Sequence, residues 1–179
     1  PTSGDASVLG YRPWERDPGY LRQLTLVMGQ KNQLVWDIPA MDTFLMNQAI
    51  YNIPTSEFKQ TVEEFSTILG LDGLLDKPVR NLSPGGRMKC EFVAALLHKP
   101  RILFLDEPTL RLDVSMQTRI RQFIQAYNRR YGATVLLTSH YMADIAALAR
   151  RVVIIHQGRL MFDGRLDQLA GDIAPFKIL

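Results

Sequence analysis

Two adjacent carboxylates, Asp106 and Glu107, follow the apolar run 102–105. Such a run is typical of a strand buried on both faces of a parallel sheet, and open α/β sheets bind ligands at the edge where strands end. One carboxylate there can hold a magnesium ion on phosphate oxygens, and the other can orient or deprotonate a water molecule. The pair therefore predicts a nucleotide-hydrolysis site, with a helix cap or a turn as the alternative interpretation.

A hydroxyl and two glycines form a second motif, Ser83-Pro84-Gly85-Gly86, which opens an apolar helical pattern over 84–98. Backbone N–H groups and the helix dipole at a helix N-terminus attract anions, and glycine lets the backbone approach a phosphate closely. The alternative is an ordinary helix whose N-cap is Ser83. The motif predicts a helix start and leaves open whether Ser83, Gly85 and Gly86 also bind phosphate.

His140 follows a strand expected over 133–138. Neighbouring strand ends in a parallel sheet lie about 5 Å apart. His140 could therefore reach the phosphate on which Glu107 acts, and the combination indicates a shared site. A helix cap or a polar surface position is the alternative for a single histidine.

Gln30 follows a strand expected over 24–28 and the intervening Gly29. A glutamine amide oxygen can ligate a metal or hold a water molecule, although nearby Gln33 offers the same chemistry. The other two histidines, at positions 98 and 156, have no comparable motif beside them, and we expect them to be structural. The histidines and the single cysteine show no metal-ligand spacing.

The composition narrows the class of protein. The 179 residues suit one domain, or one with a small subdomain, and the net charge of +3 is dispersed. The longest basic runs are the pairs Arg129-Arg130 and Arg150-Arg151, which we expect at helix ends rather than on nucleic acid. The single cysteine, Cys90, excludes an internal disulfide and fits a core position. No run approaches the ~18 apolar residues that span a bilayer, so a membrane role would require a partner.

The elements that position these residues change character along the chain. Residues 41–80 show helical spacing and predict an inserted helical subdomain, whereas strands and helices alternate after residue 81, as in a parallel α/β sheet. The expected strands cover 5–12, 24–28, 101–106, 133–138, 151–156 and 159–162. The expected helices cover 41–51, 84–98, 113–131 and 140–149, and one more that Thr55 or Ser56 caps and Gly70 ends. The expected divisions are a core segment 1–40, the subdomain 41–80, the α/β core 81–165 and a tail 166–179.

Together these motifs resemble, in order and spacing over residues 1–165, the nucleotide-binding domain of the ABC transporter family. The matching motifs are the signature (82–86), Walker B with the catalytic glutamate (102–107), the D-loop (112–113), the switch histidine (140) and the Q-loop glutamine (30). The amino-acid sequences of segments 27–34 and 87–91 resemble those of the bacterial exporter-type branch, which has separate membrane subunits.

The resemblance implies a P-loop NTPase-like ABC ATPase core with a mostly parallel sheet, and it implies ATP and Mg²⁺ as cofactors. Asp106 would hold the magnesium ion, Glu107 would polarise the attacking water, and His140 would contact the γ-phosphate. Gln30 would sense the metal and the membrane subunit. These four residues would serve the nucleotide bound by their own subunit.

The resemblance also implies a second nucleotide-binding subunit, paired head to tail with this one. Ser83, Gly85 and Gly86 would bind the γ-phosphate of the ATP that the second subunit holds. Asp113 would act across the same interface. ATP would therefore join the two subunits, and hydrolysis would release them.

A transmembrane permease is the other partner that the family implies, with this chain peripheral on the cytoplasmic face of the cell membrane. The helical block 41–80 would face the permease, and no nucleic acid is expected. Four apolar residues either contact the permease or belong to the core of the helical subdomain. They are Leu34, Val35, Trp36 and Ile38.

The sequence departs from the family pattern at three places. It contains no Gly-x-x-x-x-Gly-Lys-Ser/Thr loop, so we expect that the first strands and the P-loop are missing and that this chain alone is inactive. Pro84 stands at a signature position where the family usually has glycine. Arg111 replaces the usual D-loop glycine, and a positive φ there would strain the backbone by ~1–2 kcal/mol. The alternative is that its guanidinium reaches a phosphate.

Two other interpretations remain at this stage. A non-transport ABC ATPase of translation or DNA repair is one, although such proteins usually carry tandem cassettes or long coiled-coil insertions. An inactive remnant that serves only as an interaction module is the other.

Overall fold

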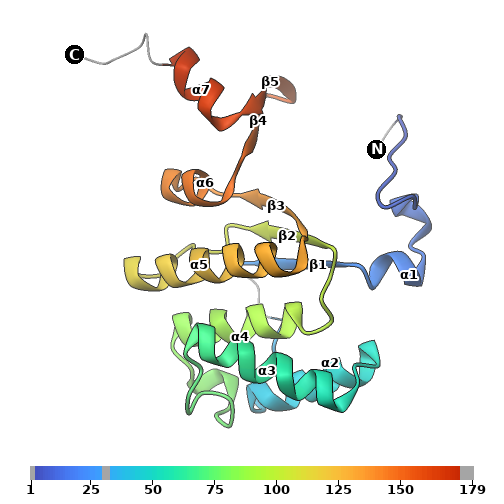
Figure 1. Cartoon of the computed structure of the whole chain (residues 1–179), viewed down its shortest axis with the longest axis vertical. Coiled ribbons are helices and arrows are strands. Elements are labelled where there is room, and N and C mark those ends of the chain that lie inside the picture. Colours follow the sequence, from blue (N-terminus) through green and yellow to red (C-terminus); the bar gives the residue numbers. More distant parts are fainter. Residues whose placement is uncertain (1–2, 30–32, 174–179) are drawn as a thin grey trace. The chain divides into compact units, whose positions relative to one another are not determined.

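A computed structural model describes residues 3–29 and 33–173, and it divides into two compact units, 1–138 and 139–179 (Figure 1). The first unit contains η1 (Pro13–Glu15), α1 (Pro18–Leu21), β1 (Leu24–Met28), α2 (Ala40–Tyr51), α3 (Thr55–Leu69), η2 (Val79–Asn81), α4 (Pro84–Leu96), β2 (Ile102–Asp106), α5 (Val114–Tyr131) and β3 (Thr134–Thr138). The second contains α6 (Met142–Leu148), β4 (Arg151–His156), β5 (Arg159–Arg165) and α7 (Leu166–Ile173).

The first unit is built on a three-stranded parallel sheet in the order β1-β2-β3. In the register, Met28 of β1 and Thr138 of β3 lie on either side of Asp106 of β2. The middle strand is apolar and mostly buried, as expected for a strand covered on both faces. All three strands therefore end at one edge, and the predicted α/β class is confirmed.

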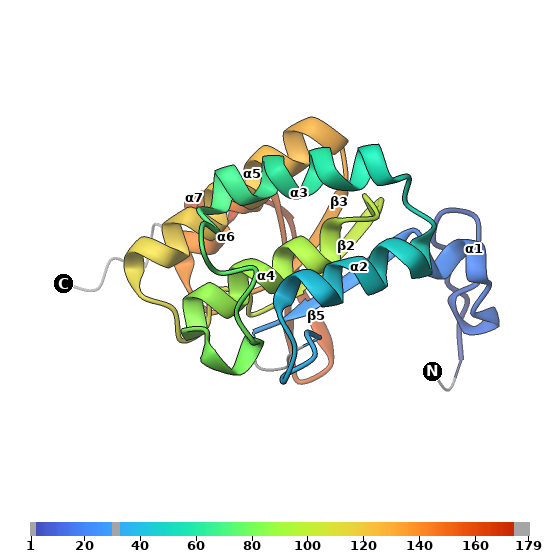
Figure 2. The ribbon, with the colours of Figure 1, turned by 90° about the horizontal axis from the view of Figure 1, so that it is seen from below.

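The helices α2, α3 and α4 gather together below the sheet in Figure 1, and Figure 2 looks up at this layer. The core between α3, α4 and α5 is aromatic. Phe65 meets Phe123 edge-on at 5.3 Å, and Phe92 meets the same ring at 5.9 Å. Because these rings come from three helices, α3 shares its core with the helix that Ser83 begins.

The second unit contains an antiparallel hairpin of β4 and β5. Gln157 and Gly158 connect the strands with φ of 48° and 74°, the backbone that a two-residue hairpin turn requires. The predicted tight turn is confirmed. No helix in the two described stretches is both long and apolar enough to cross a membrane.

One predicted strand is wrong. Residues 5–12 form only an isolated bridge between Val8 and Tyr11, because this stretch lies beside no other strand of the described sheets. The predicted helix 84–98 ends two residues early, at Leu96, and Lys99 then takes a left-handed φ of 51° before Pro100. The strand predicted over 24–28 is confirmed to the residue.

Candidate functional site

Asp106 lies at the end of the middle strand β2, where its exposed carboxylate faces the edge of the sheet. Its Oδ1 accepts a hydrogen bond from the Thr138 hydroxyl at 2.6 Å. This bond crosses from β2 to β3 and fixes the orientation of the carboxylate. One oxygen is thus anchored by the protein, which leaves the carboxylate able to contact a cation or its water shell.

Glu107 turns the chain sharply away from the sheet, with a left-handed φ of 50°. Its N–H donates to the backbone oxygen of Thr138 at 3.1 Å and lies 3.3 Å from the Thr138 hydroxyl. Its carbonyl accepts from Leu110 N–H at 3.1 Å. A non-glycine residue in this backbone region costs about 1–2 kcal/mol, and such strain concentrates at functional sites.

Gly29 closes the same turn from the β1 side. Its N–H donates to the Asp106 carbonyl at 2.9 Å, and a Cβ added at Gly29 would lie 2.2 Å from the Glu107 carbonyl oxygen. No side chain fits in that space, so glycine is required. The ends of β1, β2 and β3 are therefore joined directly around the two carboxylates. Gln30 lies outside the described residues, and its metal role stays a prediction.

Ser83 begins α4 as a side-chain N-cap, since its hydroxyl accepts from Gly86 N–H at 3.1 Å. The predicted cap is confirmed, whereas the phosphate role stays a prediction. Gly86 is buried, and an added Cβ would lie 3.2 Å from Ser83 Oγ. An added Cβ at Gly85 would lie 3.0 Å from the terminal methyl of Met116. Close packing is therefore one reason for both glycines.

Asp113 begins α5 in the same manner, and its Oδ1 accepts from Met116 N–H at 2.8 Å. Because Met116 also packs near Gly85, the predicted D-loop and the predicted signature motif adjoin within one chain. Arg111, two residues earlier, has a φ of 64°. The departure noted in the sequence thus falls on a left-handed position, where arginine is strained.

His140 belongs to the second unit, whereas Asp106 and Glu107 belong to the first. Its ring lies 4.7 Å from that of Tyr141. The preceding Ser139 hydroxyl donates to the buried Asp144 at 2.8 Å and accepts from Tyr141 N–H at 3.1 Å, which orders the turn. The proximity of His140 to Glu107 stays a prediction.

The carboxylate set fits magnesium held mainly by a nucleotide. In the described parts of the chain, no group of three His, Cys, Asp or Glu side chains is arranged to enclose a metal. Mg²⁺ commonly binds through one or two carboxylates together with phosphate oxygens and waters. Asp106, exposed and fixed by Thr138, is suited to that mode.

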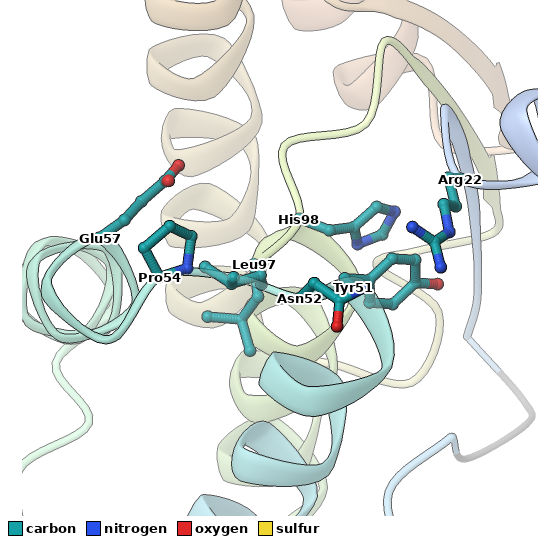
Figure 3. Close-up of a pocket in the computed structure, with 8 residues that line it drawn as sticks. Arg22, Tyr51, Asn52, Pro54, Glu57, Leu97 and His98 are labelled. Carbon is teal, nitrogen blue, oxygen red and sulfur yellow. The ribbon is translucent and has the colours of Figure 1, made fainter.

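A separate cavity of about 220 Å³ lies between α2, α3 and the end of α4, with Arg22, Asn52 and Glu57 in its wall (Figure 3). It lies near the start of β1, whereas the carboxylates follow the strand ends. His98 in its wall stacks on Tyr51 at 3.8 Å, and burial lowers the pKa of His98 to about 4. This neutral, stacked ring agrees with the expected structural role.

Cys90 agrees with its expected core position as well. The residue is fully buried, and burial raises the pKa of its thiol to about 12. Because the thiolate is the nucleophile, this cysteine is chemically inert near neutral pH. It takes no part in the site.

Residues 1–110 match the family model described as "ABC transporter". The chain is 28% identical to the ABC transporter ATP-binding protein NatA of Bacillus subtilis over 94% of this chain and 68% of that protein. It is 33% identical to the organic anion transporter ABCA8B of Mus musculus over 94% of this chain but 10% of the transporter. It is 28% identical to the spermidine/putrescine import ATP-binding protein PotA of Spiroplasma citri, over 89% of this chain and 45% of that protein.

A solved structure of the ATP binding subunit of an ABC transporter superimposes with a TM-score of 0.83. The match covers 96% of this chain and 71% of that one at 23% identity, which shows a common fold. The chain thus spans about two thirds of NatA and less than half of PotA and ABCA8B.

Proposed function

The chain belongs to the ABC transporter family, and we propose that it is part of an ATP-hydrolysing subunit that powers export through a separate membrane subunit. One observation carries the proposal most directly. Asp106 ends the middle strand and Glu107 follows it, and Thr138 of the neighbouring strand holds both residues. A nucleotide hydrolase needs one group for the metal and one for the water at this edge.

In this proposal, each residue at the strand ends has a distinct task. Mg²⁺, when bound with ATP, would neutralise charge on the phosphate oxygens. Asp106 would hold that ion directly or through water, with Thr138 keeping the carboxylate in place. Glu107 would orient and polarise the attacking water. His140 would contact the γ-phosphate, and Gln30 would sense the metal and the membrane subunit.

The start of α4 would serve a second nucleotide. Ser83 would place its hydroxyl, and Gly85 and Gly86 their backbone, against the γ-phosphate of ATP on a second nucleotide-binding subunit. The 13-residue helix α4 directs the positive end of its dipole there. Asp113 would act across the same interface; it caps α5, the helix whose Met116 side chain packs near Gly85. Two subunits would thus enclose two nucleotides.

Binding of ATP by this chain alone should be weak. The sequence contains no Gly-x-x-x-x-Gly-Lys-Ser/Thr segment, the loop whose backbone and lysine provide most phosphate contacts in P-loop proteins. The chain provides the carboxylates and the signature helix. A P-loop on the same polypeptide would have to complete the site before turnover.

The membrane subunit would dock on the surface formed by α2 and the segment before it. Val35 and Trp36 are 42% and 44% exposed, and Ile50 on α2 is 58% exposed. Leu34 is only 5% exposed, which favours the core alternative for that residue. Docking there would place the chain on the cytoplasmic face of the membrane.

Export is the finer part of the proposal. The relatives include a protein named for import and one named for organic anion transport. The amino-acid sequences of segments 27–34 and 87–91 favour export, because they resemble those of the exporter-type branch.

The test uses what we call the extended protein, in which the first strand, P-loop and helix of a family member precede this chain. We expect ATP hydrolysis that requires Mg²⁺ and that Asp106→Asn reduces at least tenfold. Asp76→Asn, at an exposed turn position outside the proposed site, is the matched control and should hydrolyse ATP at the unsubstituted rate. Equal turnover in the Asp106→Asn variant would contradict the assigned metal site.

A further inference from the structure

Glu91 is a buried carboxylate on α4 that has no task in the proposed hydrolysis. Its side chain belongs to a residue only 4% exposed. Both carboxylate oxygens accept from Gln33 N–H, at 2.9 and 3.0 Å, and Oε1 also accepts from Leu34 N–H at 3.3 Å. A side chain on the signature helix thus holds two successive backbone amides of a segment far away in sequence.

The burial of this carboxylate is costly. Burial raises the pKa of Glu91, while the hydrogen bonds from Leu34 and Gln33 and the charge of Arg87 oppose that rise. A buried carboxylate is stable only where hydrogen bonds compensate for lost hydration. The two amides provide that compensation, so the contact between α4 and residues 33–34 is a specific one.

Further contacts hold the same segment, which we call the linker (residues 33–37). The Arg87 guanidinium of α4 lies 4.4 Å from the centre of the Trp36 ring. Arg80 N–H donates to the Trp36 carbonyl at 3.0 Å, and the Arg80 side chain pairs with Asp37 at 2.8 Å. Exposed ion pairs contribute little, whereas Glu91 is buried, so Glu91 should hold the linker more strongly than the Arg80–Asp37 pair does.

We propose that Glu91 is a positioning residue that fixes the linker to the signature helix, so that both move as one body. The linker follows Gln30 in sequence and carries the exposed Trp36, and α4 begins at Ser83. The inference rests on the proposed function, in which Gln30 senses the membrane subunit and Trp36 lies on the surface where that subunit docks. Through Glu91, movement of that docking surface reaches the Ser83 end of α4.

The direct test measures amide hydrogen exchange in the full chain. Glu91→Leu introduces an apolar side chain of similar size and removes both acceptor oxygens, and we expect Gln33 and Leu34 amides to exchange ten- to a hundredfold faster. Glu91→Gln retains one acceptor oxygen and should restore part of the protection. Wild-type exchange in Glu91→Leu, or no rescue by Glu91→Gln, would overturn the proposal.

Two controls accompany the exchange measurement. The Gly86 amide, held by Ser83, should keep its rate in both variants if α4 remains intact. Glu64→Leu, which removes an ion pair between α3 and Arg130 of α5, should leave the exchange of the Gln33 amide unaffected. In a Trp14→Phe background Trp36 is the sole tryptophan. Its emission should shift to the red in Glu91→Leu, and an unchanged spectrum would contradict linker release.

A kinetic measurement separates this inference from the proposed function. In the extended protein, Glu91→Leu should lower kcat for ATP while KM changes little, because Glu91 contacts no nucleotide in this account. An unchanged kcat would overturn the positioning role. If the unsubstituted extended protein hydrolyses no ATP, the proposed function fails, while the exchange result still decides whether Glu91 holds the linker.

Discussion

Substitution of Gly29 by alanine tests how tightly the strand ends are joined. The added Cβ would lie 2.2 Å from the Glu107 carbonyl oxygen and 3.2 Å from the Glu107 carbonyl carbon. Both are backbone atoms, which no rotamer change can move. The Glu107 turn or the end of β1 must shift instead.

The size of the effect follows from this geometry. Ordinary van der Waals contact begins near 3.4 Å, so the carbonyl has to move by about 1 Å. That shift strains the Glu107–Thr138 bond at 3.1 Å and the Gly29–Asp106 bond at 2.9 Å. Overpacking costs about 1–3 kcal/mol, and one lost hydrogen bond adds about 1 kcal/mol. We expect a loss of about 2–4 kcal/mol.

Urea unfolding of the full chain, followed by far-ultraviolet circular dichroism, measures this loss. Gly85→Ala is the matched control, because its Cβ meets only the flexible Met116 side chain. The control should change the free energy of unfolding by less than about 1 kcal/mol. If Gly29→Ala is no more destabilising than Gly85→Ala, the strand ends are not packed as described.

Three further predictions concern single side chains. Arg111→Gly should raise the free energy of unfolding by up to about 1 kcal/mol in urea, because relief of left-handed strain exceeds the added chain entropy; a loss above 1 kcal/mol would show that the arginine has a stabilising role. Thr138→Val in the extended protein should lower kcat about tenfold by freeing Asp106, and Thr138→Ser should restore it; equal rates would refute the anchoring role. The folded-state pKa of His98, lowered to about 4, lies below its unfolded value of 6.5, so its stability contribution is complete above pH 6.5 and is lost as pH falls towards 4. His98→Gln should remove up to about 3 kcal/mol of that acid dependence in urea titrations, and an identical pH profile would contradict it.

Capping residues and glycine breaks in the sequence predict most of the helices and strands. The strand 24–28 is bounded by Gly29, and the helices over 84–96 and 114–131 begin at the capping residues Ser83 and Asp113. The wrong strand over 5–12 shows the limit of such signals, because a strand also requires a partner. Likewise, α7 carries no motif, and its helical form was not predicted.

The sequence proposes the candidate residues of the site but not the contacts that join them. The residues before and after Asp106 and Glu107 indicate a candidate site, and the motif position of Arg111 predicts the positive φ that the structure has. The bridging role of Thr138 and the tight fit at Gly29 depend on strand register, which joins residues distant in sequence. The sequence places Glu91 only within an apolar helical pattern, since nothing local indicates its hydrogen bonds to Gln33 and Leu34.

The most direct test of the central claim is the oligomeric state of the Glu107→Gln extended protein with ATP and Mg²⁺, measured by light scattering after gel filtration. Glutamine preserves the shape of the side chain but removes the charge that polarises water. We predict a stable ATP-bound dimer and loss of turnover, with return to monomer when ATP is replaced by ADP. A variant that hydrolyses ATP at the unsubstituted rate and stays monomeric would contradict the account.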